Sequence, residues 1–238
     1  MKIVVCLLLV TAVLAAQPKR PVEESATKGG VVKITPIRHA SLMIEGGGQV
    51  IHVDPAQGNY EGLPPADLIL ITHAHGDHLD PMIVAKLRKP GTLILGPEVI
   101  LKAVPEAAVI PNGAARDFGK WRIEAVPAYN IQRMRSAGQP YHPRGEGNGY
   151  VLSYGGSRFY VAGDTEGTPE MAALKNIDVA FIPMNLPYTM SPEEAAEAVR
   201  AFKPKAVYPY HCRGTDLAAF AKALAGSGVE VRIRDWYY

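Results

Sequence analysis

The alternation of apolar and polar positions predicts a layered α/β chain in which strands lead into helices twice. The early strands are short and separated by turn residues, whereas residues 68–71 form a continuous apolar run, as expected of a strand buried on both faces. We expect strands at residues 31–34, 41–44, 50–53, 68–71, 93–95, 121–125, 150–152, 159–161, 207–208 and 229–233. We expect helices between Pro81 and Pro90, after the capping sequence that begins at Ser191, and over residues 217–224, with a helix-like turn at 99–101. Two sheets with helices outside them fit this order.

The first sixteen residues follow another pattern, which is typical of a secretory signal peptide. Lys2 precedes an apolar run from Ile3 to Ala16 that only Thr11 interrupts, and polar residues follow. This run of 14 residues is shorter than the roughly 20 that a membrane-spanning helix needs, so we expect no permanent membrane anchor. We predict an exported protein, periplasmic or secreted, whose mature chain begins near Ala16 or Gln17. An uncleaved anchor is the alternative.

Composition and charge narrow the class of protein. Residues 17–30 are polar and end in glycine, which predicts a linker before a single domain over residues 31–238. Hydrophobic residues make up 47% and charged residues 20% of the 238 residues, so a disordered or coiled-coil chain is excluded. The net charge of +2 provides no basic field, and we expect no nucleic-acid partner. With only Cys6 and Cys212, no disulfide framework is expected.

The strongest chemical signal is a group of four metal-binding side chains within six residues. His73, His75, Asp77 and His78 lie between the buried strand and the helix, where α/β sheets place active sites. Without a metal, these groups would have to be desolvated and satisfied at a cost of about 1–3 kcal/mol each. Together they predict a metal site. A lone histidine carries less weight, so His52, within a strand, is predicted to be structural.

The motif His73-x-His75-x-Asp77-His78 resembles the signature of the metallo-β-lactamase superfamily. The resemblance extends over nearly all of residues 31–238. Three residues outside this motif extend the resemblance. Asp54 resembles the early strand-end aspartate of the family, Asp164 its metal-bridging aspartate, and His211 its last histidine. Membership would imply an α/β fold, specifically a four-layer αββα sandwich, and a centre with two divalent metal ions, usually zinc, with manganese or iron as alternatives.

The resemblance also implies a role for each matching residue. His73 and His75 would hold the first ion, and Asp164 would bridge both ions. The second ion would be held by Asp77, His78 and His211, and Asp77 is also the expected catalytic residue. Such a centre leaves room for a shared hydroxide, because two cations lower the pKa of bound water enough to supply a nucleophile near neutral pH.

One position departs from the family pattern. Many members carry the third ligand of the first ion as a histidine after the strand that corresponds to residues 123–128, where this chain has Asn130. His142 is the only later histidine before Asp164, and a branch similar to ascorbate-phosphate lactonases has a comparable Ala-Tyr-Asn segment followed by a His-Pro segment. We assign His142 as the third ligand. Without it, the first site would be weak and the centre mononuclear.

Substrate-binding candidates surround these residues in the sequence. His39 resembles a family segment near the mouth of the site, with a plain turn residue as the alternative. Asn130 would face the substrate or support the site. Arg133, Arg135 and Arg144 lie in a long loop expected to overhang the metals, and arginines suit a phosphate or carboxylate. The alternative is that they are solvated loop charges.

The predicted function is that of a metal-dependent hydrolase that cleaves an ester-like bond, namely a lactone, phosphodiester or amide. The expected substrate is a small molecule, and the arginines of the loop would suit a negatively charged one. Two alternatives stay open: a metal-binding protein of the same fold without hydrolytic turnover, and a mononuclear iron or zinc enzyme. Fold alone cannot choose among these chemistries. A nuclease is less favoured, because the sequence has no basic stripe.

Overall fold

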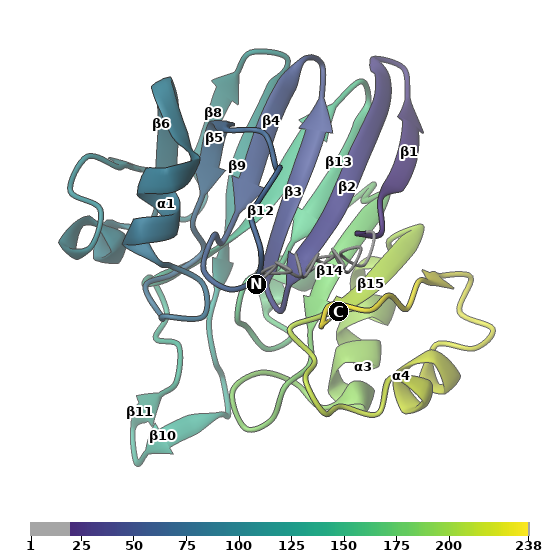
Figure 1. The fold of residues 1–238 in the computed structure, drawn as a ribbon. Coiled ribbons are helices and arrows are strands. Elements are labelled where there is room, and N and C mark those ends of the chain that lie inside the picture. The colour runs from purple at the N-terminus through teal and green to yellow at the C-terminus, as the bar shows by residue number, and fades with distance from the viewer. Residues whose placement is uncertain (1–19, 238) are drawn as a thin grey trace, which may run out of the picture.

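The computed structural model describes residues 20–237, which contain two seven-stranded sheets and several short helices (Figure 1). The strands of the first sheet, in spatial order, are β1 (Glu23–Thr27), β2 (Gly30–Arg38), β3 (Ser41–Gly46), β4 (Gln49–Val53), β5 (Ala66–Leu70), β6 (Arg88–Gly96) and β7 (Ala108–Val109). Those of the second sheet are β16 (Glu230–Val231), β15 (Ala206–Tyr210), β14 (Val179–Pro183), β13 (Ser157–Val161), β12 (Gly147–Tyr154), β9 (Trp121–Ala128) and β8 (Ala115–Phe118). A separate hairpin pairs β10 (Met134–Ser136) with β11 (Gln139–Pro140).

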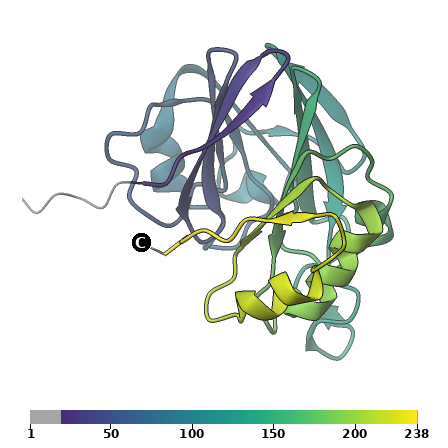
Figure 2. The same cartoon turned by 90° about the vertical axis from the view of Figure 1, so that its right-hand side faces the viewer.

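The helices lie outside the sheets and complete four layers. They are α1 (Pro81–Leu87), the 3-10 helix η1 (Glu98–Lys102), α2 (Pro169–Ala172), α3 (Pro192–Phe202) and α4 (Leu217–Ala223). Figure 2 shows the sheets from the side, with α1 beyond the purple-to-blue sheet and α3 and α4 beyond the green one. The αββα sandwich expected from the sequence is confirmed. The described residues include no helix long and apolar enough to cross a membrane.

Two apolar cores hold the layers together. One cluster fills the space between the sheets, where Leu42 of β3 and Leu152 of β12 are fully buried, and it continues to Val199 under α3. The other joins the first sheet to its outer helix, with Ile69 of β5 and Val84 of α1 among its members. Burial of this kind contributes about 25 cal/mol for each Å² of apolar surface removed from water, which is the main stabilisation of such layers.

The helix starts follow the predicted capping residues. The Asp80 side chain accepts hydrogen bonds from Met82 N and Ile83 N at the start of α1. Ser191 and Glu194 form a reciprocal capping box at the start of α3. The first helix is shorter than expected, because β6 already begins at Arg88 and takes up the residues before Pro90.

The linker predicted over residues 17–30 is wrong where it overlaps β1. Residues 23–27 pair antiparallel with β2 at the edge of the first sheet. Except for the exposed Ala26, their side chains are polar, and all are at most half-buried, so the strand carries no apolar alternation that the sequence could reveal. Backbone pairing holds it instead, together with the Glu23 carboxylate, which accepts hydrogen bonds from Arg234. The predicted signal peptide, residues 1–16, lies outside the described residues.

Candidate metal centre

The metal-binding side chains come from loops at one end of both sheets. In the first sheet β2, β4 and β5 run in the same direction, and in the second sheet β9, β13 and β15 do so. The loops that follow these strands carry His39 after β2, Asp54 after β4, His73 to His78 after β5, Asn130 after β9, Asp164 after β13 and His211 after β15. Parallel strands therefore deliver distant residues to a single site, as is usual at the carboxyl ends of α/β sheets.

Three histidines form the first group. His73, His75 and His142 place their candidate ligand atoms within 4.8 Å of one another. His73 Nε2 lies 3.1 Å from His75 Nδ1, and the rings of His75 and His142 are 4.9 Å apart between centroids. His142, which the sequence analysis assigned as the third ligand in place of a histidine at position 130, thus lies beside His73 and His75.

The Asp164 carboxylate lies between this group and the remaining ligands. Its Oδ1 is 3.3 Å from His78 Nε2, while its Oδ2 is 3.2 Å from His142 Nε2 and 3.4 Å from His211 Nε2. His211 Nε2 is also 3.2 Å from Asp77 Oδ2. The structure therefore brings together all seven residues proposed as ligands, and Asp164 faces both halves of the set.

Hydrogen bonds behind the site orient two of the imidazoles. His78 Nδ1 donates to Asp54 Oδ2 at 2.7 Å, and His142 Nδ1 donates to Asn130 Oδ1 at 2.8 Å. Each bond holds a hydrogen on Nδ1 and directs Nε2 toward Asp164, which is how metal-binding histidines are commonly fixed. Asp54, for which the sequence suggested no contact, thus positions His78.

The donor set fits a metal ion. Among the described residues, the buried atoms His78 Nε2, His142 Nε2 and Asp164 Oδ1 have no hydrogen-bond partner. Such orphaned groups cost about 1–3 kcal/mol each unless something else satisfies them. Imidazole nitrogens and carboxylate oxygens at these positions are the ligands that zinc, iron and manganese accept.

The pKa shifts in the centre reflect its buried charges. Burial raises the pKa of Asp164, but the neighbouring His211 and His78 outweigh burial and hold the pKa well below its usual range. Burial lowers the pKa of His78, but the Asp164 and Asp54 carboxylates outweigh it and raise the pKa well above 6.5. Burial, reinforced by His78, keeps the pKa of His73 well below 6.5. In the metal-free protein, the protonated His78 therefore balances the negative charges of Asp54 and Asp164. A bound metal cation can displace the proton from His78 Nε2 and supply the positive charge instead.

Three residues of the site have strained backbones. His39, Asp54 and His211 adopt left-handed conformations with φ of 56°, 47° and 45°. Such conformations cost about 1–3 kcal/mol each for residues other than glycine and persist only where the surroundings impose them. Here His211 N donates to His39 O at 3.0 Å, and Asp54 N donates to Leu70 O at 2.9 Å. The packing of the strand ends therefore imposes the positions of these side chains.

Two of the three arginines proposed for substrate binding are wrong. Arg133 forms ion pairs with Glu194 and Glu166, and the exposed Arg144 pairs with Glu170 at 2.8 Å. Neither arginine lines the cavity over the site, because these carboxylates hold their guanidinium groups elsewhere. Arg135 does line the cavity over the site.

The substrate-facing role proposed for Asn130 is also wrong. Its side chain is buried, with Nδ2 donating to Tyr188 O at 2.9 Å. Its Oδ1 accepts from both His142 N and His142 Nδ1. Because both the oxygen and the nitrogen of the amide are hydrogen-bonded within the protein, Asn130 fixes the position of His142. This is the supporting role that the sequence analysis gave as the alternative.

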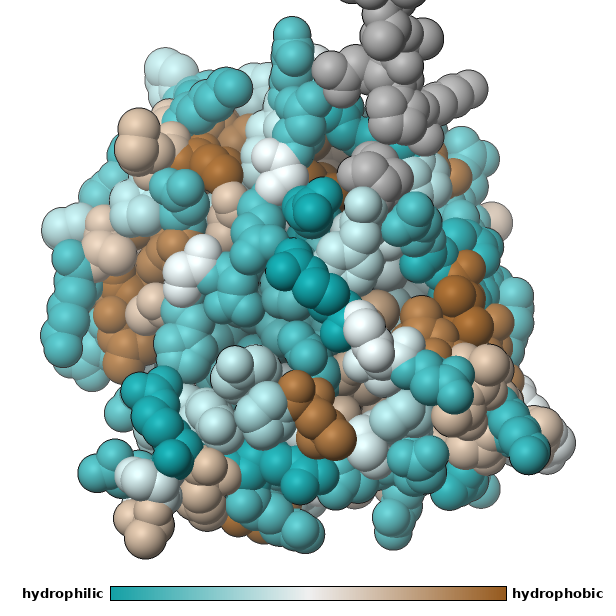
Figure 3. Space-filling model, turned by 60° about the horizontal axis from the view of Figure 1, so that its bottom comes forward, coloured by the Kyte–Doolittle hydropathy of each residue, from teal (hydrophilic) through white to brown (hydrophobic). Residues whose placement is uncertain are grey.

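A cavity of about 550 Å³ opens over the centre. Residues that the sequence did not single out complete its wall: Gln57, Tyr141, Asn185, Tyr188 and Arg213. Arg213 comes two residues after His211, and this proximity in the sequence was the only available signal for it. Figure 3 brings the lower end of Figure 1 forward and shows hydrophilic side chains across the middle of this face, with smaller apolar patches around them.

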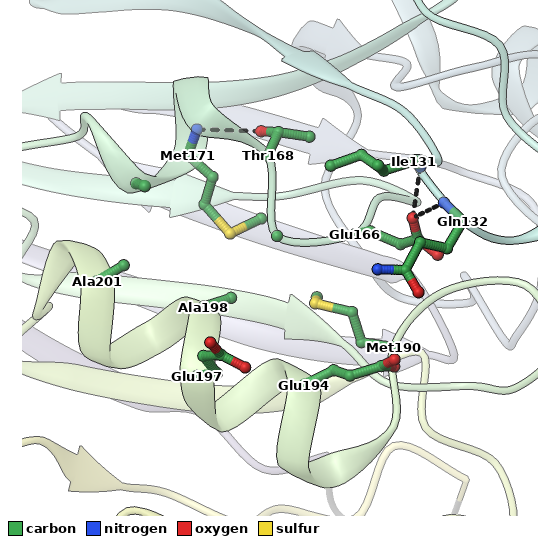
Figure 4. A pocket seen from close by; sticks show the side chains of 12 residues that line it. Ile131, Gln132, Glu166, Thr168, Met171, Met190, Glu194, Glu197, Ala198 and Ala201 are labelled. Atoms are coloured by element: carbon green, nitrogen blue, oxygen red, sulfur yellow. Dashed lines mark hydrogen bonds between the residues drawn. The ribbon is translucent and has the colours of Figure 1, made fainter.

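Glu166 anchors the loop that carries His142. Its buried carboxylate accepts hydrogen bonds from three successive backbone N–H groups, those of Ile131, Gln132 and Arg133. Figure 4 shows two of these bonds beside a separate cavity of about 290 Å³, which lies between the loop and α3. Glu166 follows Asp164 by two positions, so one short segment supplies a candidate ligand and holds the loop that supplies another.

His52 lies apart from the metal-binding residues, as expected from the sequence. His52 Nε2 donates to Pro64 O at 3.0 Å and belongs to no group of metal-binding side chains within residues 20–237. Cys212 is a buried free thiol and is likewise in none of them.

Comparisons with known proteins agree with this geometry. A family model described as a beta-lactamase superfamily domain matches residues 33–211. A UPF0173 metal-dependent hydrolase of Thermococcus kodakarensis is 34% identical over 191 residues, 76% of this chain and 84% of the relative. Its counterpart in Thermus thermophilus is 32% identical over 217 residues, 84% of this chain and 94% of the relative.

Solved structures show the same fold. A protein of Parabacteroides distasonis superposes with a TM-score of 0.86 at 44% identity, covering 91% of this chain and 99% of that one. Igni18, a metallo hydrolase of Ignicoccus hospitalis, shares the fold at 24% identity and a TM-score of 0.71, covering 86% of this chain and 95% of that one. The chain therefore belongs to the UPF0173 metal-dependent hydrolases of the metallo-β-lactamase superfamily.

Proposed function

We propose that this chain is an exported hydrolase that uses two divalent metal ions, with zinc as the first candidate, to cleave an ester-like bond in a small anionic substrate. The position of Asp164 supports the two-ion centre best, since its two oxygens face different sets of histidines. His73, His75 and His142 would hold one ion, and Asp77, His78 and His211 the other. Lactones, phosphodiesters and amides are the bonds that this chemistry suits.

The side chains prepare the site for attack on such a bond. When bound, the two ions would lower the pKa of a shared water and polarise the oxygen of the bond to be cleaved. Asp54 and Asn130 hold two of the imidazoles with their Nε2 atoms directed toward the centre. Asp77, with a side chain 34% exposed, borders the cavity where a substrate would approach.

Two arginines support a negative charge on the substrate. Arg135 and Arg213 both line the cavity, and neither has a carboxylate partner among the described residues. Each instead lies near an aromatic ring, Arg135 at 5.9 Å from the Tyr141 centroid and Arg213 at 5.3 Å from that of Tyr237. Arg213 Nη2 also donates to Gln57 Oε1 at 3.4 Å, and the remaining N–H groups of both arginines can bind a carboxylate or a phosphate.

Metal analysis followed by a substrate panel tests the proposal. We expect two ions per chain in the purified protein and metal-dependent turnover of at least one of a lactone, a phosphodiester and a β-lactam. Chelation should abolish that turnover, and added zinc should restore it. One ion per chain at saturation would contradict the dinuclear centre. Inactivity on all three substrates with both ions bound would contradict the proposed substrate classes.

The arginines are tested with matched substrates. Arg135→Gln and Arg213→Gln should each raise KM for an anionic ester about tenfold, and leave KM for its neutral analogue nearly unchanged. Arg144→Gln is the control, because this arginine pairs with Glu170 outside the cavity. Equal effects on both substrates would contradict a charge-specific role.

Export is tested by the mature N-terminus. The apolar run from Ile3 to Ala16 supports cleavage near Ala16 or Gln17. Protein recovered from an extracytoplasmic fraction and sequenced from its N-terminus should begin there. An intact Met1 on cytosolic protein would contradict this part of the proposal.

A further inference from the structure

His39 lies in the metal centre without a defined task. Its side chain is buried, and its ring packs on that of His211 with centroids 3.8 Å apart. Its Nε2 is 3.2 Å from Asp77 Oδ2, the same oxygen that His211 Nε2 approaches. Distances alone would allow His39, Asp77 and His211 to bind one ion, since their candidate ligand atoms lie within 4.8 Å of one another.

The second ring nitrogen of His39, Nδ1, contacts the C-terminal segment. His39 Nδ1 is 2.8 Å from the Tyr237 hydroxyl, whose oxygen already accepts a hydrogen bond from Cys212 N at 3.1 Å. Because that oxygen serves as an acceptor, its own hydrogen is available for His39 Nδ1. Burial raises the pKa of Tyr237 to about 12, so the phenol keeps this hydrogen at neutral pH.

The backbone holds this arrangement in place. His39 N donates to Trp236 O at 3.2 Å, and His39 O accepts from His211 N at 3.0 Å. Trp236 itself is only 1% exposed and packs edge-on against Phe181 and Tyr210. The C-terminal segment is therefore anchored in the core and presents Tyr237 to His39 at a set distance.

We propose that Tyr237 and His39 are positioning residues for Asp77, and that His39 is not a metal ligand. The Tyr237 hydroxyl donates to His39 Nδ1, which places the imidazole hydrogen on Nε2, from which it is donated to Asp77 Oδ2. A nitrogen that carries a hydrogen has no lone pair for a metal. Ligating carboxylates commonly need such a bond to hold their orientation, and Asp77 sits on a partly exposed loop after Gly76. The role of Asp77 rests on the proposed function, but the tautomer does not.

The tautomer can be read directly by ¹H–¹⁵N NMR of the histidine side chains in the metal-free and zinc-loaded protein. We expect His39 to carry its hydrogen on Nε2 in both states. Tyr237→Phe removes only the hydroxyl and should shift His39 toward a mixture of tautomers. Tyr154→Phe is the control, because it removes a buried hydroxyl that donates to Gly29 O far along β12, and it should leave the His39 signals unchanged.

Zinc binding supplies the second readout. His39→Ala and Tyr237→Phe should bind two zinc ions at saturation, with the weaker ion bound about 10-fold less tightly, and should lower kcat more than they change KM. His39→Gln should recover much of the affinity, because its amide N–H can replace the Nε2 donor.

Two results would overturn the proposal. One is a wild-type protein whose His39 Nε2 lacks a hydrogen, and the other is the loss of one zinc ion at saturation in His39→Ala. Because the tautomer is measured without metal or substrate, these results are separable from failure of the proposed function. If the wild-type protein binds two ions but His39 Nε2 carries no hydrogen, only the positioning role of Tyr237 and His39 is refuted. If the wild-type protein binds one ion, only the dinuclear centre is refuted.

Discussion

Asn130 and His142 share a task at the scale of single residues. The amide oxygen of Asn130 accepts from both the backbone and the ring of His142, so the two residues act as one unit. His142 supplies the candidate ligand atom Nε2, and the hydrogen bonds to Asn130 fix the orientation of its ring. The number of ions in the centre should therefore depend on His142, and their affinity on both residues.

Replacing each residue separates these effects. His142→Ala should lower the metal content from about two ions per chain toward one and cut turnover by several powers of ten, since both ions act on the nucleophile and on the developing charge. Asn130→Ala should still bind two ions at saturation, but with affinity reduced about 10- to 100-fold. Elemental analysis and zinc titration measure both quantities.

Gln132→Ala serves as the control, because this exposed side chain in the same loop makes no side-chain hydrogen bond within the described residues. A variant at Asn130 that loses an ion, beside a His142 variant that keeps both, would mean that the third ligand has been assigned wrongly.

His52 gives a prediction about pH that is independent of the metal ligands. Burial lowers its pKa below 6.5, although the bond to Pro64 O opposes the shift. A folded-state pKa below the unfolded value gives a contribution to stability that is present above pH 6.5 and lost as the pH falls toward the folded-state pKa. The free energy of unfolding should thus decline less for His52→Gln than for the wild type between pH 7 and pH 5. The difference should be at most about 1.4 kcal/mol for each pH unit.

Urea unfolding of metal-free protein at both pH values measures this difference. Parallel declines in the two proteins would show that the imidazole of His52 titrates alike in the folded and unfolded states.

At the scale of elements, the loop after β9 carries a candidate ligand, His142, and contributes Arg135 and Tyr141 to the wall of the cavity over the centre. Much of it is exposed, and in Figure 1 its β10–β11 hairpin extends away from the sheets. The Glu166 carboxylate is what ties its start to the core, through three backbone N–H groups. Arg133 adds a bond from its guanidinium to Thr189 O at 3.2 Å.

Removing this anchor should loosen the loop. Glu166→Ala leaves three N–H groups without their acceptor, which should cost about 1–3 kcal/mol of local stability for each group that water cannot reach. Hydrogen exchange should become faster at residues 131–133 and 142, and zinc affinity at the three-histidine group should fall. Glu197→Ala is the control, since this exposed carboxylate of α3 lines the separate cavity of about 290 Å³ beside Glu166 and has no hydrogen-bond or ion-pair partner among residues 20–237. Unchanged exchange at residues 131–133 in the Glu166 variant would contradict the anchoring role.

At the scale of the whole molecule, the centre links the two sheets. His73, His75, Asp77 and His78 follow strand β5 of the first sheet, whereas Asp164 and His211 follow strands of the second. A ligand that binds only the folded chain stabilises it by an amount that grows with concentration, about 2.7 kcal/mol at 100 times its Kd. Ions held between the sheets should therefore contribute directly to the stability of the sandwich.

Chelation should lower the Tm, and added zinc should restore it. Thermal unfolding followed by circular dichroism, with and without a chelator, measures the shift. His142→Ala should show a smaller shift than the wild type, because it retains fewer ions. The same Tm with and without chelator would indicate that metal binding is not coupled to folding.

Sequence alone predicts those features that depend on residues close together in the chain. The spacing in His73-x-His75-x-Asp77-His78 lies within one loop, the caps at Asp80 and Ser191 act within one helical turn, and apolar alternation marks most strands. These signals were enough to predict the strands, the helix starts and a metal site, because local geometry and burial follow directly from local pattern. The αββα sandwich and the convergence of the distant ligands followed from the resemblance to the metallo-β-lactamase superfamily.

The roles of other side chains depend on the paths of loops and on partners far apart in the chain, and these become visible in the folded structure. Arg133 and Arg144 could not be separated from Arg135 by sequence, because the difference lies in carboxylates of Glu194, Glu166 and Glu170 that fold nearby. The contact of His39 with Tyr237 joins residues 198 positions apart. Side chains of one type, in one loop, receive different tasks because the free energy of each depends on which charges and hydrogen-bond partners the fold places around it.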